Sequence, residues 1–277
     1  MIFSKEDALR YSRHIILKDI GMRGQKKLLS SKVLVIGAGG LGAPALMYLA
    51  ASGVGQLGIA DDDKVELSNL QRQIIHKTES IGMSKTVSAM NTLREINPNI
   101  KVITYEMRIT SENIGKIIQD YDFIIDGTDN FSAKFLINDA CVLYKKPFCH
   151  AGVRGFSGQL MTYVPDEGPC YRCIFGDIPI GAEFESCSQA GVLGSLTGII
   201  GTLQALEAQK YITGAGKLLT GRIMIFDGLT MKFRDVKLPA KNKSCRVCGE
   251  NADINELQTS NYIENTVCKL KNGVNNE

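Results

Sequence analysis

The chain has 277 residues, of which 44% are hydrophobic and 22% are charged, and its formal net charge is +3. This composition is typical of a globular protein with a real core, and it excludes a disordered or fibrous chain. The small net charge and the scattered basic residues give no indication of binding to nucleic acid or to a membrane surface.

The amino-terminal region predicts helices and no export signal. Residues 5–31 have an amphipathic pattern that predicts one or two helices, split near Gly21–Gly24. The first residues are charged and lack an apolar core, so we expect a cytoplasmic protein. The uncharged stretches 33–60 and 186–206 are interrupted by glycine, proline or polar residues, which argues against membrane spans.

From Val33 onward, strand patterns and helix patterns alternate. The expected strands are 33–37, 56–60, 101–105, 122–126 and 147–151. The expected helices are 41–52, 84–96, 111–119 and 131–144. Such alternation predicts an α/β fold with a doubly wound, mostly parallel Rossmann-like sheet, which binds its ligand at the carboxyl ends of the strands.

After His150 the pattern changes to antiparallel strands continuing the sheet. These are expected over 158–165, 222–228 and 231–238, with a helix over 190–212 and an aperiodic loop over 174–189. We expect one domain over residues 1–249. Few large apolar residues follow Cys248, so we expect residues 250–277 to form a poorly ordered tail.

A glycine-rich turn follows the first strand of the sheet. Gly37, Gly39 and Gly42 have the G-x-G-x-x-G spacing, which lets the backbone approach phosphate groups while the next helix offers free N–H groups. Asp61 ends the next strand, where an acid binds the ribose of a nucleotide. We interpret its neighbours, Asp62 and Asp63, as solvated turn residues. These features alone also fit an NAD-dependent dehydrogenase.

The polar residues that follow indicate a nucleotide that is cleaved rather than only bound. Asn69 and Arg72 share a face if their segment makes one helical turn, and Lys85 follows. A guanidinium binds phosphate oxygens bidentately, and a lysine adds a point charge. Asp129, after a later strand, is placed to hold Mg²⁺ against a triphosphate, whereas Asn130 either joins it or caps the next helix.

Four of the eight cysteines form two C-x-x-C pairs, namely Cys170, Cys173, Cys245 and Cys248. Two such pairs in a cytosolic chain predict a tetrahedral thiolate metal site rather than disulfides. Cys187 lies in the aperiodic loop just before a helix, where it is either activated by the helix amino terminus or only packed. We interpret Cys141 and Cys149 as core residues, and none of the three histidines has a partner at ligand spacing.

Taken together, these motifs resemble the ThiF/MoeB/HesA family, bacterial relatives of ubiquitin-activating enzymes. The matching segments follow the family's order over about residues 5–249: YSRHI, GAGGLG, ADDD, LSNLQRQ, GMSK, DGTDN, CYRC, SCSQAGVLG, GTLQALEA and CRVCG. The resemblance implies that ATP adenylates the C-terminal Gly-Gly carboxylate of a ubiquitin-fold sulfur-carrier protein and that pyrophosphate is released.

The resemblance also implies roles for individual residues. Those implied to contact ATP and its Mg²⁺ are Gly40, Asp61, Ser68, Asn69, Leu70, Gln71, Arg72, Lys85, Asp129 and Asn130. Arg13 is similar to the family arginine that reaches into the partner subunit's site, which implies a homodimer with shared active sites. The paired cysteines match the family's structural Zn²⁺ site. Cys187 matches a cysteine that bonds covalently to the carrier in some members and is dispensable in others.

Carriers of the thiamin and the molybdopterin pathways both fit this pattern, and the segments GVLG, GRIMIFDG and FRDVKL slightly favour the molybdopterin type. A chain of 277 residues leaves no room for an appended rhodanese domain, so we expect a separate sulfur donor.

Other functions stay open on the sequence alone. One is adenylation of a different acceptor, a tRNA base or a peptide C-terminus; the weak net charge disfavours the tRNA version. Another is an NAD(P)-dependent oxidoreductase with a structural zinc ion, which leaves Arg72, Lys85 and Asp129 without a role. A last one is a nucleotide-binding scaffold without catalysis, which the intact set of cations disfavours.

Overall fold

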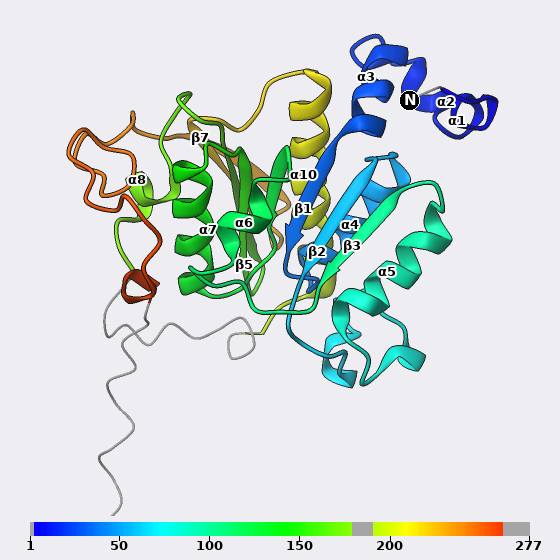
Figure 1. Ribbon diagram of the computed structural model, residues 1–277, viewed down its shortest axis with the longest axis horizontal. Coiled ribbons are helices and arrows are strands. Elements are labelled where there is room, and N and C mark those ends of the chain that lie inside the picture. Colours follow the sequence, from blue (N-terminus) through cyan, green and yellow to red (C-terminus); the bar gives the residue numbers. More distant parts are fainter. Residues whose placement is uncertain (1–2, 179–190, 263–277) are drawn as a thin grey trace, which may run out of the picture.

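A single eight-stranded sheet runs through the described part of the chain, in the order β3-β2-β1-β4-β5-β6-β7-β8 (Figure 1). The computed structural model describes residues 3–178 and 191–262. The strands are β1 Lys32–Ile36, β2 Gln56–Ala60, β3 Lys101–Tyr105, β4 Phe123–Asp126, β5 Phe148–Arg154, β6 Ser157–Tyr163, β7 Arg222–Asp227 and β8 Lys232–Lys237. All the strands expected from the sequence are therefore confirmed, with ends shifted by at most a few residues.

The sheet has a parallel half and an antiparallel half. β3, β2, β1, β4 and β5 are parallel, whereas β6, β7 and β8 continue the sheet as antiparallel strands. β1 and β4 are nearly fully buried, as expected of central strands that helices cover on both faces. The strand order changes direction between β1 and β4, and in doubly wound sheets the ligand crevice lies at the carboxyl ends of the two strands at such a point.

Helices cover both faces of the sheet. The longer helices are α3 Gly21–Ser30, α4 Gly42–Ala51, α5 Lys85–Ile96, α7 Phe131–Leu143 and α10 Gly194–Thr213. The shorter ones are α1 Lys5–Arg10, α2 Ser12–Ile15, α6 Ile114–Ile118, α8 Tyr171–Phe175, and the 3₁₀ turns η1 Leu67–Asn69, η2 Thr78–Ser80 and η3 Thr259–Tyr262. α4, α5 and α10 share a core on one face, and α6 and α7 share another on the opposite face (Figure 1). None of the helices in the described residues combines the length and apolar character needed to cross a membrane.

The amino-terminal region differs from the one or two helices that we expected. Three helices form instead of one or two, while the break before α3 lies near the predicted position, where Gly21 takes a left-handed φ of 59°. These helices pack at the amino-terminal ends of the strands (Figure 1). There, Arg10 donates to the Ile96 carbonyl that ends α5, and the buried Asn97 amide donates to the Tyr11 hydroxyl.

The segment after Cys248 also differs in part from expectation. Residues 250–262 lie against α7 instead of forming part of a poorly ordered tail, and Ile254 and Tyr262 are buried. The Tyr262 hydroxyl donates to Asp139 of α7, the Tyr262 carbonyl accepts a bond from the Ser132 hydroxyl, and Arg246 pairs with Asp253, so polar contacts and two buried apolar side chains together hold this short segment. The rest of the expected tail, 263–277, lies outside the described residues. Part of the expected loop 174–189 is described, and its first residues belong to α8.

Candidate functional site

The glycine turn after β1 forms a tight cradle at the crevice. Gly37 has a φ of 93°, and a Cβ on Gly42 would lie 1.8 Å from the Gly37 carbonyl oxygen, so neither position accommodates a side chain. α4 begins at Gly42 without a side-chain cap, which leaves backbone N–H groups facing the turn. Thr197, near the start of α10, packs against Gly40. This geometry is that of a phosphate site at a helix amino terminus.

Asp61 links the end of β2 to the glycine turn. One carboxylate oxygen accepts the Ala38 N–H at 2.7 Å, and the other accepts the Asp63 N–H at 2.9 Å. Burial raises the pKa of Asp61, while the ammonium of Lys85 and these two backbone bonds oppose the rise. The carboxylate therefore lies beside the cradle, as expected for the acid that binds a ribose.

Lys85 and Arg72 lie on the same edge of the sheet. Lys85 is the first residue of α5, and its buried ammonium lies 2.6 Å from an Asp63 carboxylate oxygen. Asp63 is exposed, as expected of a solvated turn residue, but its carboxylate also pairs with the lysine and its carbonyl accepts the Lys85 N–H. Arg72 is half-buried, with one guanidinium nitrogen donating to the Ser68 carbonyl at 3.0 Å.

The segment between these cations is shaped by local hydrogen bonds. Asn69 is buried, and its side-chain oxygen accepts the Glu66 N–H, so Asn69 caps η1. The backbone of Gln71 and Arg72 lies against α10, because a Cβ on Gly194 would come within 2.3 Å of the Gln71 carbonyl oxygen. Ser68 and Leu70 belong to the same turn.

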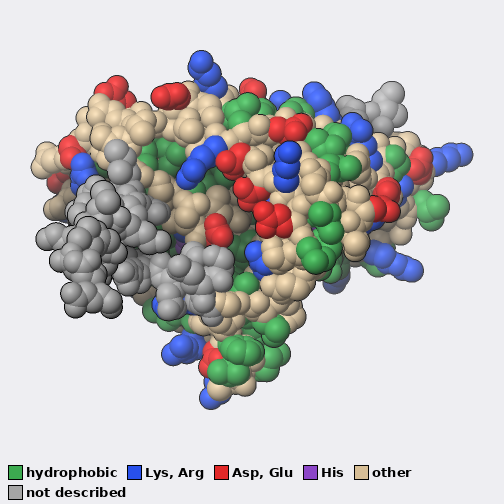
Figure 2. All heavy atoms as spheres, turned by 90° about the horizontal axis from the view of Figure 1, so that it is seen from below, with side chains coloured by type: hydrophobic (Ala, Val, Ile, Leu, Met, Phe, Trp, Pro, Cys, Tyr) green, Lys and Arg blue, Asp and Glu red, His purple; other side chains and the backbone are tan. Residues whose placement is uncertain are grey.

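The two residues after β4 that the sequence left ambiguous have separate positions. Asn130 caps α7, since its side-chain oxygen accepts the Ala133 N–H at 2.8 Å. Asp129 is exposed at the crevice and is not used as that cap. The carboxylate of Asp129 thus remains available for a cation. Figure 2 looks onto this edge and shows Asp and Glu side chains gathered near the middle of the surface, with Lys and Arg side chains beside them.

A buried ionic cluster beneath these residues was missed by the sequence reasoning. Asp126 accepts bonds from the Lys134 ammonium at 3.1 Å, from His150 Nδ1 at 2.8 Å and from the Thr128 hydroxyl at 2.6 Å. Lys134 also donates to the carbonyls of Thr128 and Ala151, at 2.7 and 2.8 Å. The cluster therefore fixes the loop that carries Asp129.

The charges of this cluster follow from burial and proximity. Burial alone would raise the pKa of Asp126, but Lys134, His150 and Thr128 together hold it below its usual range. Burial, aided by Lys134, lowers the pKa of His150 to about 4, so the imidazole is neutral at pH 7. Nothing in sequence spacing could indicate this pair, because Asp126 and His150 become neighbours only through the pairing of β4 with β5.

The four paired cysteines meet in one cluster, as predicted. Their sulfur atoms are 3.8 Å apart for Cys170–Cys173, 3.6 Å for Cys170–Cys245, 3.4 Å for Cys173–Cys248 and 3.5 Å for Cys170–Cys248. Four thiolates at about 2.3 Å from a tetrahedral zinc ion would be roughly 3.8 Å apart, so the spacing fits Zn²⁺ closely. The Asn242 N–H points at Cys173 Sγ over 3.4 Å and favours a thiolate there.

The remaining predicted residues lie apart from the crevice or outside the described chain. Arg13 is an exposed residue of α2 at the amino edge of the sheet, opposite the glycine turn, so it does not reach the site of its own chain. Cys187 lies outside the described residues. Cys141 and Cys149 are fully buried core residues, as expected, and burial raises the pKa of both thiols.

Comparison with known proteins agrees with this arrangement. The model of the ThiF family matches residues 11–247. The chain belongs to the ThiF family. It is 45% identical over 254 residues to "Adenylyltransferase and sulfurtransferase MOCS3" of Aedes aegypti, covering 92% of this chain and 58% of that protein. It is 43% identical over 261 residues to "SAMP-activating enzyme E1" of Haloferax volcanii, covering 94% of this chain and 96% of that enzyme.

Solved structures share the fold of this ThiF-family chain. A crystal structure of Escherichia coli MccB superimposes with a TM-score of 0.78 at 24% identity, covering 87% of this chain and 75% of MccB. The structure of PaaA superimposes with a TM-score of 0.71 at 26% identity, covering 85% and 74%. The chain spans little more than half the length of the MOCS3 relatives that it matches, 58% in the Aedes protein and 53% in "MOCS3-1" of Zea mays.

Proposed function

We propose that this chain uses ATP to adenylate the C-terminal Gly-Gly carboxylate of a ubiquitin-fold sulfur-carrier protein. The observation that carries the proposal is the buried Lys85 ammonium, held by Asp63 next to the ribose acid Asp61. A hydride-transferring dinucleotide site has no need of a buried cation there, whereas cleavage of a triphosphate does. The names of the MOCS3 and SAMP-activating relatives support the same chemistry.

In the proposed reaction, a carboxylate oxygen of the carrier attacks the α-phosphorus of ATP. The bond from that phosphorus to the bridging oxygen breaks, and pyrophosphate leaves with the electron pair. Lys85 and Arg72 stabilise the charge that develops on the phosphates, and the free N–H groups at the start of α4 bind phosphate oxygens. No general base is required, because the nucleophile is already ionised at pH 7.

Magnesium and zinc take separate positions in this proposal. The exposed carboxylate of Asp129 would hold Mg²⁺, which would neutralise part of the triphosphate charge. The four paired cysteines would hold a Zn²⁺ ion that ties the segment after β6 to the segment after β8. With four thiolate ligands and no open position, such an ion stabilises structure and takes no part in the reaction.

The active site would be completed by a second copy of the chain. Arg13 lies at the edge of the sheet opposite its own glycine turn, so we propose that it enters the crevice of the partner in a homodimer. The adenylated carrier would then accept sulfur from a separate donor protein, with Cys187 as the residue to examine for a covalent link. The carrier is of the molybdopterin or the thiamin type.

Carrier-dependent exchange of labelled pyrophosphate into ATP tests the proposal. We expect exchange with a carrier ending in Gly-Gly and none with the same carrier lacking its last glycine. Lys85→Met should abolish exchange, while Lys77→Met, an exposed lysine paired with Glu95, should leave it unchanged. Absence of exchange with every Gly-Gly carrier tried, at saturating Mg-ATP, would contradict the proposed function.

A further inference from the structure

His76 is a buried histidine that lies beside the glycine turn. It belongs to the segment between η1 and η2, and only 6% of its surface is exposed. Its Nε2 atom lies 3.1 Å from the Ala38 carbonyl oxygen in the glycine turn, and its Nδ1 atom lies 2.9 Å from the Ser88 hydroxyl of α5. The imidazole therefore bridges the turn and the helix that begins with Lys85.

These two contacts determine which ring nitrogen carries the proton. A carbonyl oxygen only accepts hydrogen bonds, so Nε2 must carry the hydrogen and donate to Ala38. Burial, aided by the Lys85 ammonium, lowers the pKa of His76 to about 4, so the ring is neutral at pH 7 and holds one proton. Nδ1 is then an acceptor, and the Ser88 hydroxyl donates to it. Ser88 therefore stabilises the tautomer that binds the glycine turn.

Both backbone groups of Ala38 are held by side chains. Its N–H donates to Asp61 at 2.7 Å, and its carbonyl accepts the bond from His76. In a planar trans peptide the carbonyl and the following N–H point in opposite directions. With the Ala38 carbonyl turned toward the imidazole, the Gly39 N–H points to the open side of the turn. In the part of the chain that the structure describes, this N–H has no hydrogen-bond partner, so it is free to bind a phosphate oxygen.

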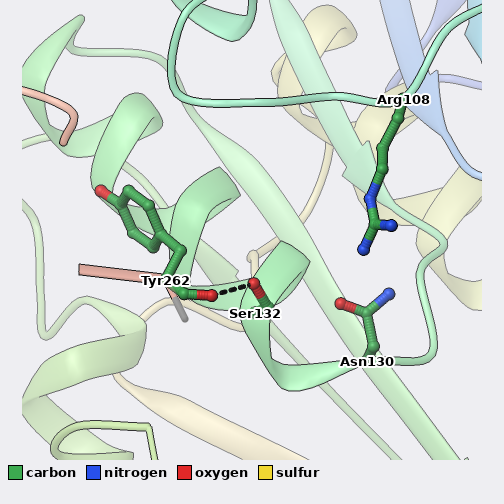
Figure 3. A pocket seen from close by; sticks show the side chains of 4 residues that line it. All are labelled: Arg108, Asn130, Ser132 and Tyr262. Carbon is green, nitrogen blue, oxygen red and sulfur yellow. Dashed lines mark hydrogen bonds between the residues drawn. The ribbon is translucent and has the colours of Figure 1, made fainter. Parts of the chain in front are cut away.

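Backbone donors and side-chain donors are aimed in different ways. Figure 3 shows Arg108 pointing across a hollow toward Asn130, between the loop after β3 and the start of α7. A long side chain such as this can rotate about its own bonds to meet a ligand. A backbone N–H turns only with its peptide unit, so its direction is set by the groups that hold that unit. For the Gly39 N–H, the group that holds the carbonyl of its peptide is His76.

We propose that His76 is a positioning residue, which aims the Gly39 N–H at the phosphates of the bound nucleotide, and that Ser88 orients the imidazole for this task. His76 acts through the Ala38 peptide rather than on the phosphates directly. A donor that is already aimed needs no reorganisation when charge develops on a phosphate, so its direction affects both binding and rate. The inference rests on the proposed use of ATP and adds the residues that set the direction of one donor.

The test compares a nucleotide with a ligand that lacks phosphates. Binding of Mg-ATP and of adenosine to the full chain is measured by displacement of a fluorescent ATP analogue, for the wild type and for His76→Phe. We expect the Kd for Mg-ATP to rise by about tenfold, the effect of losing one hydrogen bond to a charged group, while the Kd for adenosine stays within about twofold. His76→Gln should recover most of the ATP affinity, because its amide NH₂ can still donate to Ala38.

A matched pair of variants on α5 separates positioning from a general loss of stability. The Ser88 hydroxyl bonds to His76, whereas the Thr92 hydroxyl, one turn further along α5, donates to the Ile75 carbonyl at 2.7 Å. Ser88→Ala and Thr92→Val each remove one bond between α5 and the same segment, so both should lower the urea midpoint of unfolding by similar amounts. Only Ser88→Ala should weaken Mg-ATP, and by less than His76→Phe.

The proposal has clear contrary outcomes. It is wrong if His76→Phe binds Mg-ATP as the wild type does, if adenosine is weakened by the same factor, or if Thr92→Val weakens Mg-ATP as much as Ser88→Ala. Should His76→Phe fail to fold, Ser88→Ala decides, and unchanged ATP affinity in that variant overturns the assignment.

The positioning role and the proposed function fail in distinguishable ways. Nucleotide binding needs no carrier, so unchanged ATP affinity in the variants overturns the role of His76 even when carrier-dependent exchange is observed. Conversely, a selective loss of ATP affinity supports this role even when no carrier supports exchange. A wild-type chain that binds no ATP would overturn both.

Discussion

Two buried carboxylates lie near opposite ends of α7, and their surroundings shift their pKa values in opposite directions. Asp126, at the crevice end, is held ionised by Lys134, His150 and Thr128, which come from several elements. Asp139, at the cysteine end, receives three bonds from Arg172, at 2.8, 3.0 and 2.9 Å. Burial raises the pKa of Asp139 although Arg172 opposes the rise, whereas the pKa of Asp126 is lowered.

The difference shows how one helix serves two sites. The Asp126 cluster distributes its bonds over β4, β5 and the loop bearing Asp129, so it fixes the geometry of the crevice. The Asp139 pair depends on Arg172, which stands between Cys170 and Cys173, so it ties α7 to the cysteine cluster. Removing the cation from either pair should therefore lower the free energy of unfolding. Loss of Lys134 should disturb the crevice, whereas loss of Arg172 should disturb the cysteine cluster.

The largest effect is expected from Lys134→Met. This change removes the main cation from a fully buried carboxylate, so the free energy of unfolding should fall by about 3–5 kcal/mol. Because Lys134 also holds the Thr128 carbonyl, the Mg²⁺ concentration that half-saturates pyrophosphate exchange should rise. Urea unfolding and a magnesium titration measure the two effects. As a control, Lys210→Met breaks the pair with the buried Glu207 on α10 and should leave the magnesium response unchanged.

A somewhat smaller effect is expected from Arg172→Met. This change leaves Asp139 without its bidentate partner. Because the carboxyl group can then take up a proton, we expect the free energy of unfolding to fall by only about 3 kcal/mol. The variant should also lose metal during dialysis against a mild chelator, as measured by zinc content per chain. Its KM for ATP should match the wild type. A variant that keeps its metal but loses ATP affinity would contradict the division of roles along α7.

Asp129→Asn should separate function from stability. The side chain is exposed and does not cap α7, so unfolding should change by no more than about 0.5 kcal/mol. Exchange should fall by roughly 100-fold at fixed Mg²⁺, equivalent to about 2.7 kcal/mol. Exchange that continues at the wild-type rate would exclude Asp129 as the magnesium ligand.

The smallest effect concerns pH. The pKa of His150 is lowered to about 4 in the folded chain, so between pH 6.5 and 4 the unfolded chain binds the extra proton and stability falls as the pH is lowered. The slope from one such group is at most about 1.4 kcal/mol per pH unit. His150→Gln should reduce this slope. His76, whose pKa is also lowered to about 4, contributes to the same pH range and remains in the variant. Equal slopes in the two proteins would contradict a neutral buried His150.

The sequence predicted the parts of the molecule that depend on local pattern. Alternating periodicity placed the strands and the main helices, and the glycine spacing located the tight turn that contacts Asp61. The two C-x-x-C pairs predicted that their four cysteines lie in one cluster, because four thiols can bind one metal ion only if they lie together. The strands, helices and glycine turn depend on residues that are close in sequence. The cysteine cluster depends on a residue type that has few other roles when it occurs in C-x-x-C pairs.

The tertiary structure decided which side chains meet across the sheet. The bond between Asp126 and His150 depends on the register of β4 with β5, and the pairing of Lys85 with Asp63 depends on how α5 follows the turn after β2. The contact of Tyr262 with α7 includes its bond to Asp139, which lies far away in sequence. Periodicity records which face of an element is buried but not which partner covers it, so such long-range contacts appear only once the chain has folded.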